Sequence, residues 1–493
     1  MATAVVKPDL PGSVLNWVGD TQQQVEPNEN EIAAILGTAN WGPKGIETGG
    51  TALYQSWPAF IADYGSDLSS PGVLAVYQAF RGQDVAGAGG AGGVYFHRLA
   101  GSAAAAATKT LNNSAATPAP ALKLDALYTG SFGNRLSAIV DADPQNASNH
   151  RLRLLLDGVE VEKFSYAQTD IAGLASAINA RPSRYVKATS LATGTALALT
   201  AGTNFTGGDD GATVTPTDYL NAQRSLEFKD FAVVAPAALT DVAVKNQLAA
   251  WVRSMDDNQR PIRLVIGGAA GETVDQAIAE LDGNAGLRDE HIIRFAVGTW
   301  HDSVTGMDLS TAQLGPRVAG ALLARGERSA LTRTLFGGLD VVGNTGPSND
   351  ELRAGRDKGL TMLRQVSNPA ANVAIAQGVT TFIDKNAPGR PYVLFSEPRI
   401  VGLLDRIKRQ IVEWGDDVVI GDLPVTDDTR ALVRKEIRKI LDDLETVGLS
   451  EPGSGFVNVE PSADPALADA IPYEFGFIPT RTANYLIGNG RVR

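Results

Sequence analysis

Two glycine-rich stretches have the composition of phosphate-binding loops, and the first lies in the wrong context. Gly87, Gly89 and Gly92 fit the pattern G-x-G-x-x-G, whose glycines let the backbone approach a pyrophosphate. The pattern binds dinucleotides where it follows a strand and opens a helix. Here it precedes the strand-like run 94–99. The expected structure is therefore a surface loop that leads into a strand.

The second stretch, GGAAG at 267–271, has the right order for a ligand-binding turn. It follows the apolar run 262–266 and precedes a helix expected over 272–281, and open α/β sheets bind ligands at such turns. It lacks the Lys and the Ser or Thr of a P-loop. Small residues are also needed wherever a strand turns tightly into a helix, which is the simpler explanation. An α/β enzyme or nucleotide-binding protein that uses Gly267–Gly271 is kept as the alternative function.

No other catalytic or metal-binding pattern stands out in the 493 residues. The chain has no cysteine and four histidines, and the spacing of the closest pair, His291 and His301, matches no zinc motif. There is no G-x-S-x-G nucleophile elbow, and the paired carboxylates are expected at helix ends or on solvated faces. The sequence favours a protein that is not an enzyme and that uses no cofactor and no metal.

The composition indicates a folded protein that does not bind nucleic acid. The chain is 44% hydrophobic and 20% charged, with a formal net charge of −12, and an acidic surface repels phosphate backbones. No run approaches the about 20 apolar residues of a transmembrane helix. The first residues lack the basic and apolar segments of a signal peptide. We therefore expect neither a nucleic-acid partner nor insertion into a membrane.

The elements that would position a site begin with an α/β core. Residues 231–235, 262–266 and 292–297 are continuous apolar runs, each followed by a helical segment such as 312–325. Strands of this kind are typical of a parallel sheet covered by helices on both faces.

A segment of different composition separates this core from the N-terminal part. From 116 to 217 the chain is rich in Ala, Thr, Gly and Asp, and short strands are expected at 151–156, 159–166 and 196–200. We interpret this segment as a small β-rich domain inserted in a larger one.

Two amphipathic helices are expected near the C-terminus, over 401–414 and 427–447. The polar side of the second helix carries a basic stripe, although the net charge of the whole chain is negative. A solvated helix face is the commoner explanation of such a stripe, and contact with a partner is the functional hypothesis. Its members are Arg430, Arg434, Arg438, Lys435 and Lys439.

Both ends of the chain have the character of extended arms. Strand-forming residues in 1–25 are interrupted by Pro8 and Pro11, and the strand-like tail 473–493 has no capping signal. Segments that cannot bury their own apolar side chains are either disordered or suited to pair with another sheet.

Several segments follow one another in an order known from one protein family. No single segment is specific, but the series covers nearly the whole chain and is weakest over 136–217. It comprises Ile35–Pro43 (ILGTANWGP), Gly93–Leu99 (GVYFHRL), Thr129–Arg135 (TGSFGNR), Gly315–Ala324, Val373–Thr381, and Arg399–Trp414 with Asp405 as its acidic member. This order resembles that of the tail sheath proteins of contractile-tailed bacteriophages and related contractile injection systems.

The resemblance implies a mixed α/β, multidomain architecture. The units it implies are an N-terminal arm (1–25), a discontinuous α/β sheath core (26–115 and 218–395), an inserted, outward-facing β-rich domain (116–217), a C-terminal helix-and-strand domain facing a tube (396–477) and a C-terminal arm (478–493).

The resemblance also implies a mechanical function. Sheath subunits stack as hexameric rings around a tail tube and contract from a metastable extended state, which drives the tube through the host envelope. The implied partners are further copies of the chain, the tail tube protein, and baseplate and tail-terminator proteins. The implied location is the virion tail, assembled in the host cytoplasm. A phage tail and a phage-derived bacteriocin or injection device remain alternatives.

Specific residues follow from this comparison with the family. The basic stripe is expected to dock on an acidic tube surface. The arms are expected to add strands to the sheets of neighbouring subunits. The arm residues are Val5, Val6, Val14, Leu15 and Trp17 at one end and Tyr485, Leu486 and Ile487 at the other.

Overall fold

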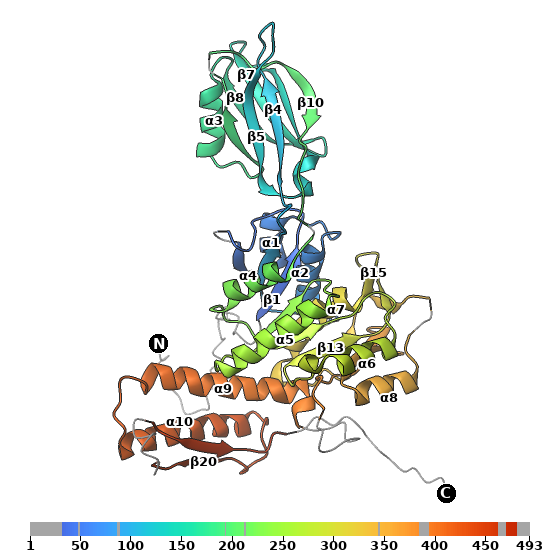
Figure 1. The fold of residues 1–493 in the computed structure, drawn as a ribbon, viewed down its shortest axis with the longest axis vertical. Helices are drawn as coiled ribbons and strands as arrows, with labels where there is room; N and C mark the ends of the chain where they lie inside the picture. Colours follow the sequence, from blue (N-terminus) through green and yellow to red (C-terminus); the bar gives the residue numbers. More distant parts are fainter. Residues whose placement is uncertain are drawn as a thin grey trace, which may run out of the picture.

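The computed structural model describes residues 32–47, 50–85, 89–192, 194–211, 213–343, 346–383, 394–461 and 470–480. A large mixed sheet lies at the centre of the molecule, a β-rich unit projects from one end, and two long helices cross the other end (Figure 1). The mixed α/β, multidomain fold expected from the sequence is confirmed.

The central sheet has nine strands, and its middle strands from β3 to β18 run parallel. Antiparallel strands close both edges. In spatial order the strands are β16 (Leu335–Phe336), β19 (Val373–Gln377), β18 (Leu360–Gln365), β13 (Ile292–Ala296), β12 (Arg263–Ile266), β11 (Val233–Pro236), β1 (Ile32–Thr38), β3 (Gly93–Leu99) and β2 (Thr51–Tyr54).

Helices cover both faces of this sheet, because its middle strands are apolar on both sides. Side chains of alternate strand positions separate into two buried clusters, one per face. One face carries α1 (Trp57–Tyr64), α2 (Pro71–Arg81) and α7 (Thr311–Arg325), and the other carries α4 (Pro216–Leu226), α5 (Val242–Asp257) and α6 (Val274–Gly283). The core strands and helices expected from the sequence are present, with boundaries shifted by a few residues.

Smaller elements complete the body. Helix α8 (Asn349–Asp357) packs along β18. A three-stranded sheet contains β14 (Thr299–Asp302), β15 (Met307–Ser310) and β17 (Leu339–Val341). Short 3-10 turns occur at Ser131–Arg135, Ala285–Leu287, Gly326–Arg328 and Leu394–Ser396.

The projecting unit has two sheets, one helix and its own apolar core. One sheet contains β4 (Ala106–Asn112), β5 (Pro120–Thr129) and β9 (Val186–Ser190), and the other contains β10 (Thr200–Asn204), β6 (Leu136–Ala142), β7 (Asn149–Leu156) and β8 (Val159–Ala167); the helix is α3 (Ile171–Ala180). Its first strand, β4, lies before residue 116, where the change of composition begins. The strand expected at 196–200 is wrong, because Leu197 forms only an isolated bridge and β10 begins at Thr200.

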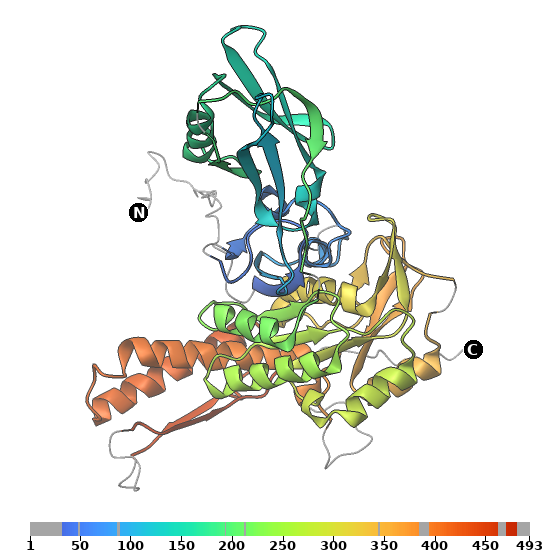
Figure 2. The ribbon, with the colours of Figure 1, turned by 45° about the horizontal axis from the view of Figure 1, so that its top comes forward.

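The two ends of this unit meet where it leaves the body (Figure 2). The amide of Gly101 donates a hydrogen bond to the carbonyl of Gly211 (2.8 Å), and a Cβ on either glycine would overlap neighbouring backbone atoms. The buried Arg98 on β3 donates to the carbonyl of Thr129 (2.9 Å) at the end of β5. Trp41 packs against Phe132, with ring centroids 4.9 Å apart.

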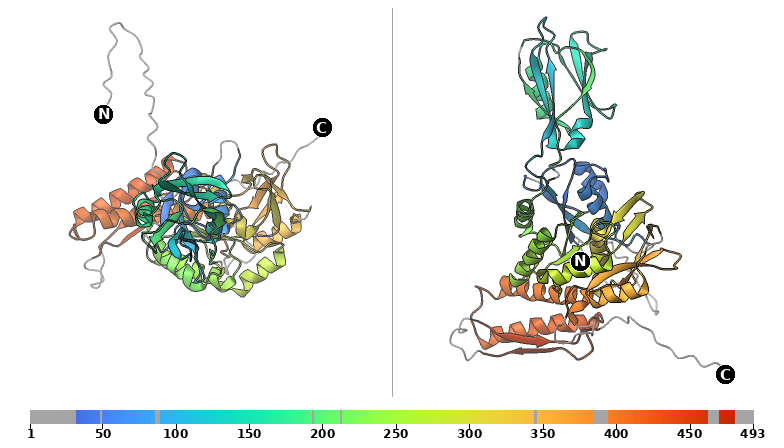
Figure 3. Two further views of the ribbon diagram at one scale, coloured as in Figure 1. Left: turned by 90° about the horizontal axis from the view of Figure 1, so that it is seen from above. Right: turned by 45° about the vertical axis from the view of Figure 1, so that its right-hand side comes forward.

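The C-terminal part contains α9 (Pro398–Val418), α10 (Asp427–Thr446), β20 (Phe456–Val459) and β21 (Tyr473–Gly476). The two helices pair through the apolar faces expected from the sequence, with Ile407, Ile437 and Leu441 in a shared core. The two strands form an antiparallel sheet against α10. Figure 3 shows that the far end of the helix pair extends beyond the body. The predicted arm residues lie outside the described part of the chain.

Candidate functional site

The turn Gly267–Gly271 is filled by the protein itself. The amide of Gly268 donates to the Thr311 hydroxyl (2.8 Å) and the amide of Gly271 to the Thr299 hydroxyl (3.1 Å). A Cβ at Gly267 would overlap the backbone at Ala312, where α7 begins. Two of the backbone donors that could hold a phosphate are therefore engaged, and glycine is required at 267 by the close approach of α7.

A carboxylate also lies against this turn. The side chain of Glu272 lies where a Cβ on Gly268 would be. It pairs with the fully buried Arg294, which also contacts Glu280 (3.0 Å). Glu280 in turn accepts from the buried Lys245 (2.9 Å). Because the carboxylate of Glu272 itself lies against the turn, the geometry favours scaffolding over phosphate binding.

The first glycine-rich stretch also packs against the body. Gly87 lies outside the described residues. A Cβ on Gly90 would overlap the carbonyls of Ala79 and Phe80 at the end of α2. The stretch leads into the buried strand β3, as the sequence predicted. Glycine is needed here for a close backbone approach.

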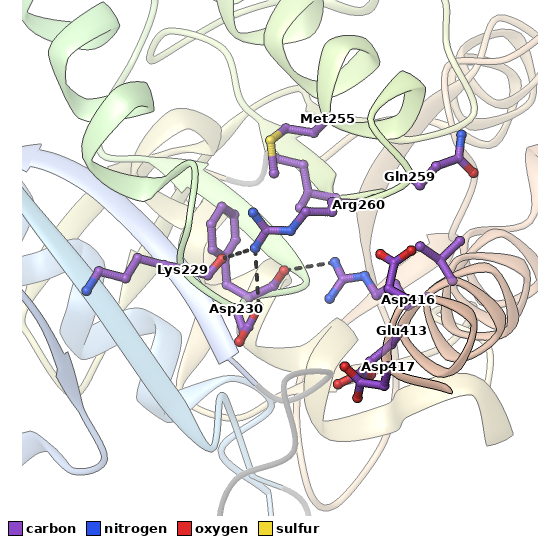
Figure 4. A pocket seen from close by; sticks show the side chains of 12 residues that line it. Lys229, Asp230, Met255, Gln259, Arg260, Glu413, Asp416 and Asp417 are labelled. Carbon is purple, nitrogen blue, oxygen red and sulfur yellow. Dashed lines mark hydrogen bonds and ion pairs between the residues drawn. The ribbon is translucent and has the colours of Figure 1, made fainter. Parts of the chain in front are cut away.

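A pocket of about 260 Å³ lies between the amino ends of β11 and β12 and the outer side of α9 (Figure 4). Its two arginines are bound to the protein. Arg409 donates to the carbonyl of Phe231 (3.0 Å), and Arg260 donates to the carbonyl of Lys229 (3.2 Å) and to Asp230 (3.2 Å).

Apart from Asp230, the acidic lining of the same pocket comes from one face of α9. Glu413, Asp416 and Asp417 lie across from Arg260, and Met255 and Ile262 line the apolar part. Arg409 of α9 donates to the carbonyl of Phe231, so a hydrogen bond joins α9 to the sheet here. The pocket contains no nucleophile paired with a base, so it carries no catalytic assignment.

The part of the chain that the structure describes contains neither a cluster of metal-binding side chains nor a membrane-spanning helix. Within that part, no three or more side chains among His, Cys, Asp and Glu gather closely enough to bind a metal ion. None of its helices combines the length and apolar character of a membrane span.

A buried charged clamp joins the C-terminal helix α9 to the sheet. The ring of His291, at the start of β13, donates from Nε2 to Asp405 Oδ1 (3.0 Å) and from Nδ1 to Asp289 Oδ1 (3.2 Å). Asp405 lies on α9, and its second oxygen is 3.9 Å from Arg263 Nε on β12. All four side chains are largely buried.

This clamp holds a charged histidine at neutral pH. Burial disfavours the charged ring, but hydrogen bonds to Asp289 and Asp405 and their negative charges outweigh it and raise the pKa of His291 to about 10. Burial likewise opposes ionisation of Asp289, but the hydrogen bond with His291 lowers the pKa of Asp289. The orientation of α9 is thus fixed by a cation between two carboxylates.

Sequence analysis missed this clamp, because His291 and Asp405 are 114 residues apart and neither belongs to a recognisable motif pair. Asp405 was noted as the acidic residue of its helix. Its partners could be identified only once the sheet order was known.

The predicted basic stripe lies on α10 beside β20. Arg434 donates to the carbonyl of Val459 (2.7 Å) and Arg438 to the carbonyl of Gly455 (2.7 Å). Arg430 pairs with Asp427 (2.6 Å). The stripe therefore has a structural role that the sequence did not predict, since it holds β20 in place.

The remaining members of the stripe are lysines. Lys435 and Lys439 are exposed, and Lys439 pairs with Glu436 (3.1 Å) in a solvated contact. In the described part of the chain, neither lysine makes a backbone hydrogen bond like those of Arg434 and Arg438.

Within the residues that the structure describes, the sheet formed by β20 and β21 has two strands. Phe456 on β20 is 50% exposed and Tyr473 on β21 is 45% exposed. Two-stranded sheets are marginally stable unless packing or further strands support them. The exposed edge and aromatic side chains make this sheet a candidate acceptor for another strand.

Comparisons with known proteins identify the fold. No protein-family model matches the sequence. A provisionally named tail sheath protein of Enterococcus phage phiEF24C is 26% identical over 245 residues, which make up 49% of this chain and 40% of that protein. The match thus spans about two fifths of that relative's length.

Solved structures match over almost the entire chain. The sheath tail protein from Desulfitobacterium hafniense has a TM-score of 0.69 and 19% identity, with 96% of this chain and 100% of that chain covered. The sheath tail protein from Listeria innocua has a TM-score of 0.61 and 20% identity, with 91% and 94% covered. The sheath of an extracellular contractile injection system in its contracted state has a TM-score of 0.53 and 12% identity, with 99% and 98% covered.

These matches show that the chain has the fold of contractile-tail sheath proteins. The resemblance to sheath proteins drawn from the sequence is thus confirmed at the level of the fold. The particular relatives are a phage tail protein and sheath proteins, one of them from a contractile injection system, and their names describe structural proteins.

Proposed function

We propose that this protein is the structural subunit of a contractile tail sheath, either of a phage tail or of a related injection device. The observation that carries the proposal is the match over 96% of this chain and 100% of the D. hafniense sheath tail protein. A match of that extent includes the body, the β-rich unit and the C-terminal helices together. The filled Gly267–Gly271 turn supports the structural role over the enzyme alternative.

In the proposed assembly, copies of the chain form stacked hexameric rings around a tail tube. The sheath is built in an extended, metastable state and contracts, which drives the tube through the host envelope. The contracted-state sheath among the structural relatives supports this motion. The energy is stored as surface that is buried only after contraction, so no nucleotide is needed.

The proposed partners are the tail tube protein, the baseplate and the tail terminator, and the proposed location is the virion tail after assembly in the host cytoplasm. The β-rich unit would face outward and the C-terminal helices would face the tube. These two parts lie at opposite ends of the molecule (Figure 1), which supports that orientation. For contact with an acidic tube, Lys435 and Lys439 are better candidates than Arg434 and Arg438, which hold β20.

The terminal arms would link the subunits by β-augmentation. The two-stranded sheet β20–β21 is the proposed acceptor, because it has few strands and exposes Phe456 and Tyr473. Backbone pairing with an added strand would complete the sheet, and the arm's apolar side chains would cover these aromatic residues. The proposed donors are the arm residues named above, at both ends of the chain.

Electron microscopy of the purified protein at high concentration tests the proposal. Hollow tubes with a rotationally symmetric wall are the expected result. Deletion of residues 1–18 should give a folded, soluble protein that forms no tubes, because the body keeps its core and loses one linking arm. Normal tubes from the deleted chain would contradict the arm model. Failure of the full chain to form tubes, alone and with tube protein added, would contradict the proposed function.

A further inference from the structure

A basic pocket opens at the edge of the central sheet, where β16, β18 and β19 meet. It has a volume of about 310 Å³ and none of the residues that line it is acidic. Its polar lining comprises Arg333, Arg364, Gln365, Ser367 and Asn368.

One of the arginines has an unused hydrogen-bond donor. Nε of Arg364 is buried and has no hydrogen-bond acceptor among the residues that the structure describes, and the same side chain lines the adjoining pocket beside α8. Neither Arg333 nor Arg364 forms an ion pair with any residue in the described ranges of the chain. A buried donor without an acceptor is costly, and a guanidinium matches a carboxylate in geometry and charge. The pocket therefore fits an acidic side chain.

A surface of opposite charge lies at the turn between α9 and α10. The stretch from Gln410 to Thr429 contains six carboxylates and no Lys or Arg. Within it Ile420 is 69% exposed and Leu423 is 38% exposed. The six acidic residues, all exposed, are Glu413, Asp416, Asp417, Asp422, Asp427 and Asp428.

The two surfaces lie on opposite sides of the molecule. The α9–α10 turn is at one side in Figures 1 and 2, and α8, which packs on β18 next to the pocket, is at the other. They are therefore too far apart to meet within one chain. Two complementary surfaces on opposite sides of a subunit join copies head to tail, and such contacts close into a ring where the rotation permits.

We propose that the pocket around Arg333 and Arg364 binds the acidic α9–α10 turn of a second copy of this chain. The exposed apolar side chains of the turn would pack on Leu335 and Val366, which line the same pocket. This inference rests on the proposed function in one respect, since it takes the partner to be another subunit.

The absence of cysteine from the sequence allows a direct test by disulfide trapping. One variant carries Ser367→Cys in the pocket and the other carries Leu423→Cys in the turn, so all arginines and carboxylates are kept. Mixed and mildly oxidised, they should form a disulfide-linked dimer. The matched control is Ser148→Cys, an exposed serine on the β-rich unit, which should give no dimer with Leu423→Cys.

Charge reversal tests the chemistry of the contact. Arg333→Glu with Arg364→Glu in the Ser367→Cys chain should lower the dimer yield at least tenfold, and salt should lower the unreversed yield because these charges are partly solvated. Arg333→Glu alone, at an exposed position, gives the same direction of change if the double variant fails to fold.

Two outcomes separate this contact from the sheath function. A dimer yield equal to that of the Ser148→Cys control overturns the contact, and tubes seen in the same sample leave the proposed function standing. A specific dimer from a chain that forms no tubes supports the contact and counts against the sheath.

Discussion

Substitution of His291 by Gln removes the cation that fixes α9 on the sheet. The two carboxylates of Asp289 and Asp405 then remain close together in a largely buried position, with Arg253 3.4 Å from Asp289 and Arg263 3.9 Å from Asp405 as the nearby cations. Gln is of similar size and keeps one amide donor, so the change is mainly one of charge. We expect α9 to separate from the sheet more readily, while the cores of the body and of the β-rich unit stay intact.

The size of the effect follows from the pKa of His291. A pKa of about 10 in the folded chain, against an ordinary value of 6.5, corresponds to about 5 kcal/mol in favour of the bound, charged ring. Loss of one partner from a buried ion pair costs about 3–5 kcal/mol in other proteins. We therefore expect His291→Gln to lower the free energy of opening α9 by about 3–5 kcal/mol at pH 6.

The same pKa fixes the direction of the pH dependence. Because the folded-state pKa is raised, the stabilisation by His291 is fully present below pH 6.5 and is lost as the pH rises towards about 10. The difference between the wild-type protein and the variant should thus shrink by about 3 kcal/mol between pH 6 and pH 9.

Hydrogen exchange of the α9 amides measures this opening locally. His301→Gln is the matched control, because His301 pairs with Asp308 (2.7 Å) in an exposed contact and should change stability by less than about 1 kcal/mol. A difference between wild type and His291→Gln that stays constant from pH 6 to pH 9 would refute the charged clamp.

Three other predictions concern packing, ligands and the tube. Gly320→Ala should destabilise the body by about 1–3 kcal/mol, because a Cβ there overlaps the Ala79 carbonyl between α7 and α2. Gly415→Ala, in open space on α9, should stabilise by about 0.5–1 kcal/mol; thermal denaturation that gives both variants the same sign would contradict the packing argument. ATP, ADP and NAD should leave the melting temperature unchanged, and an increase that grows with concentration would restore the nucleotide alternative. Lys435→Glu with Lys439→Glu should prevent assembly on preformed tubes without loss of helix content, and assembly at the wild-type level would remove these lysines from the tube contact.

The core of the fold could be predicted because the pattern of apolar residues in the sequence matches the pattern of buried positions in the structure. The runs near 233, 263 and 292 are apolar at every position, as strands covered on both faces must be, and α9 and α10 have a clear helical period. The β-rich unit was harder, because its strands are half exposed and rich in Ala, Thr and Gly. Thus β5, β6 and α3 were missed, and the strand expected at 196–200 is placed wrongly.

The contacts between units could not be predicted from sequence spacing. The clamp at His291, the arginines that hold β20 and the basic pocket at Arg364 each join segments that are brought together only by the order of strands and helices. The basic stripe of α10 shows the difference between identifying residues and predicting their contacts. Its residues were found from the helical period, but the hydrogen bonds of Arg434 and Arg438 to β20 depend on how the chain returns after α10.

The junction of Gly101 with Gly211 has a consequence for how such a chain can change. Because the two connections meet as hydrogen-bonded neighbours, the β-rich unit between them forms a closed loop of chain that starts and ends at one place on the body. The closure entropy grows only slowly with the length enclosed. The body therefore constrains the position of the two connections and places little constraint on the size of what they carry. A lineage could enlarge, shrink or exchange this outer unit without refolding its central sheet, and an engineer could graft a foreign domain there by the same route.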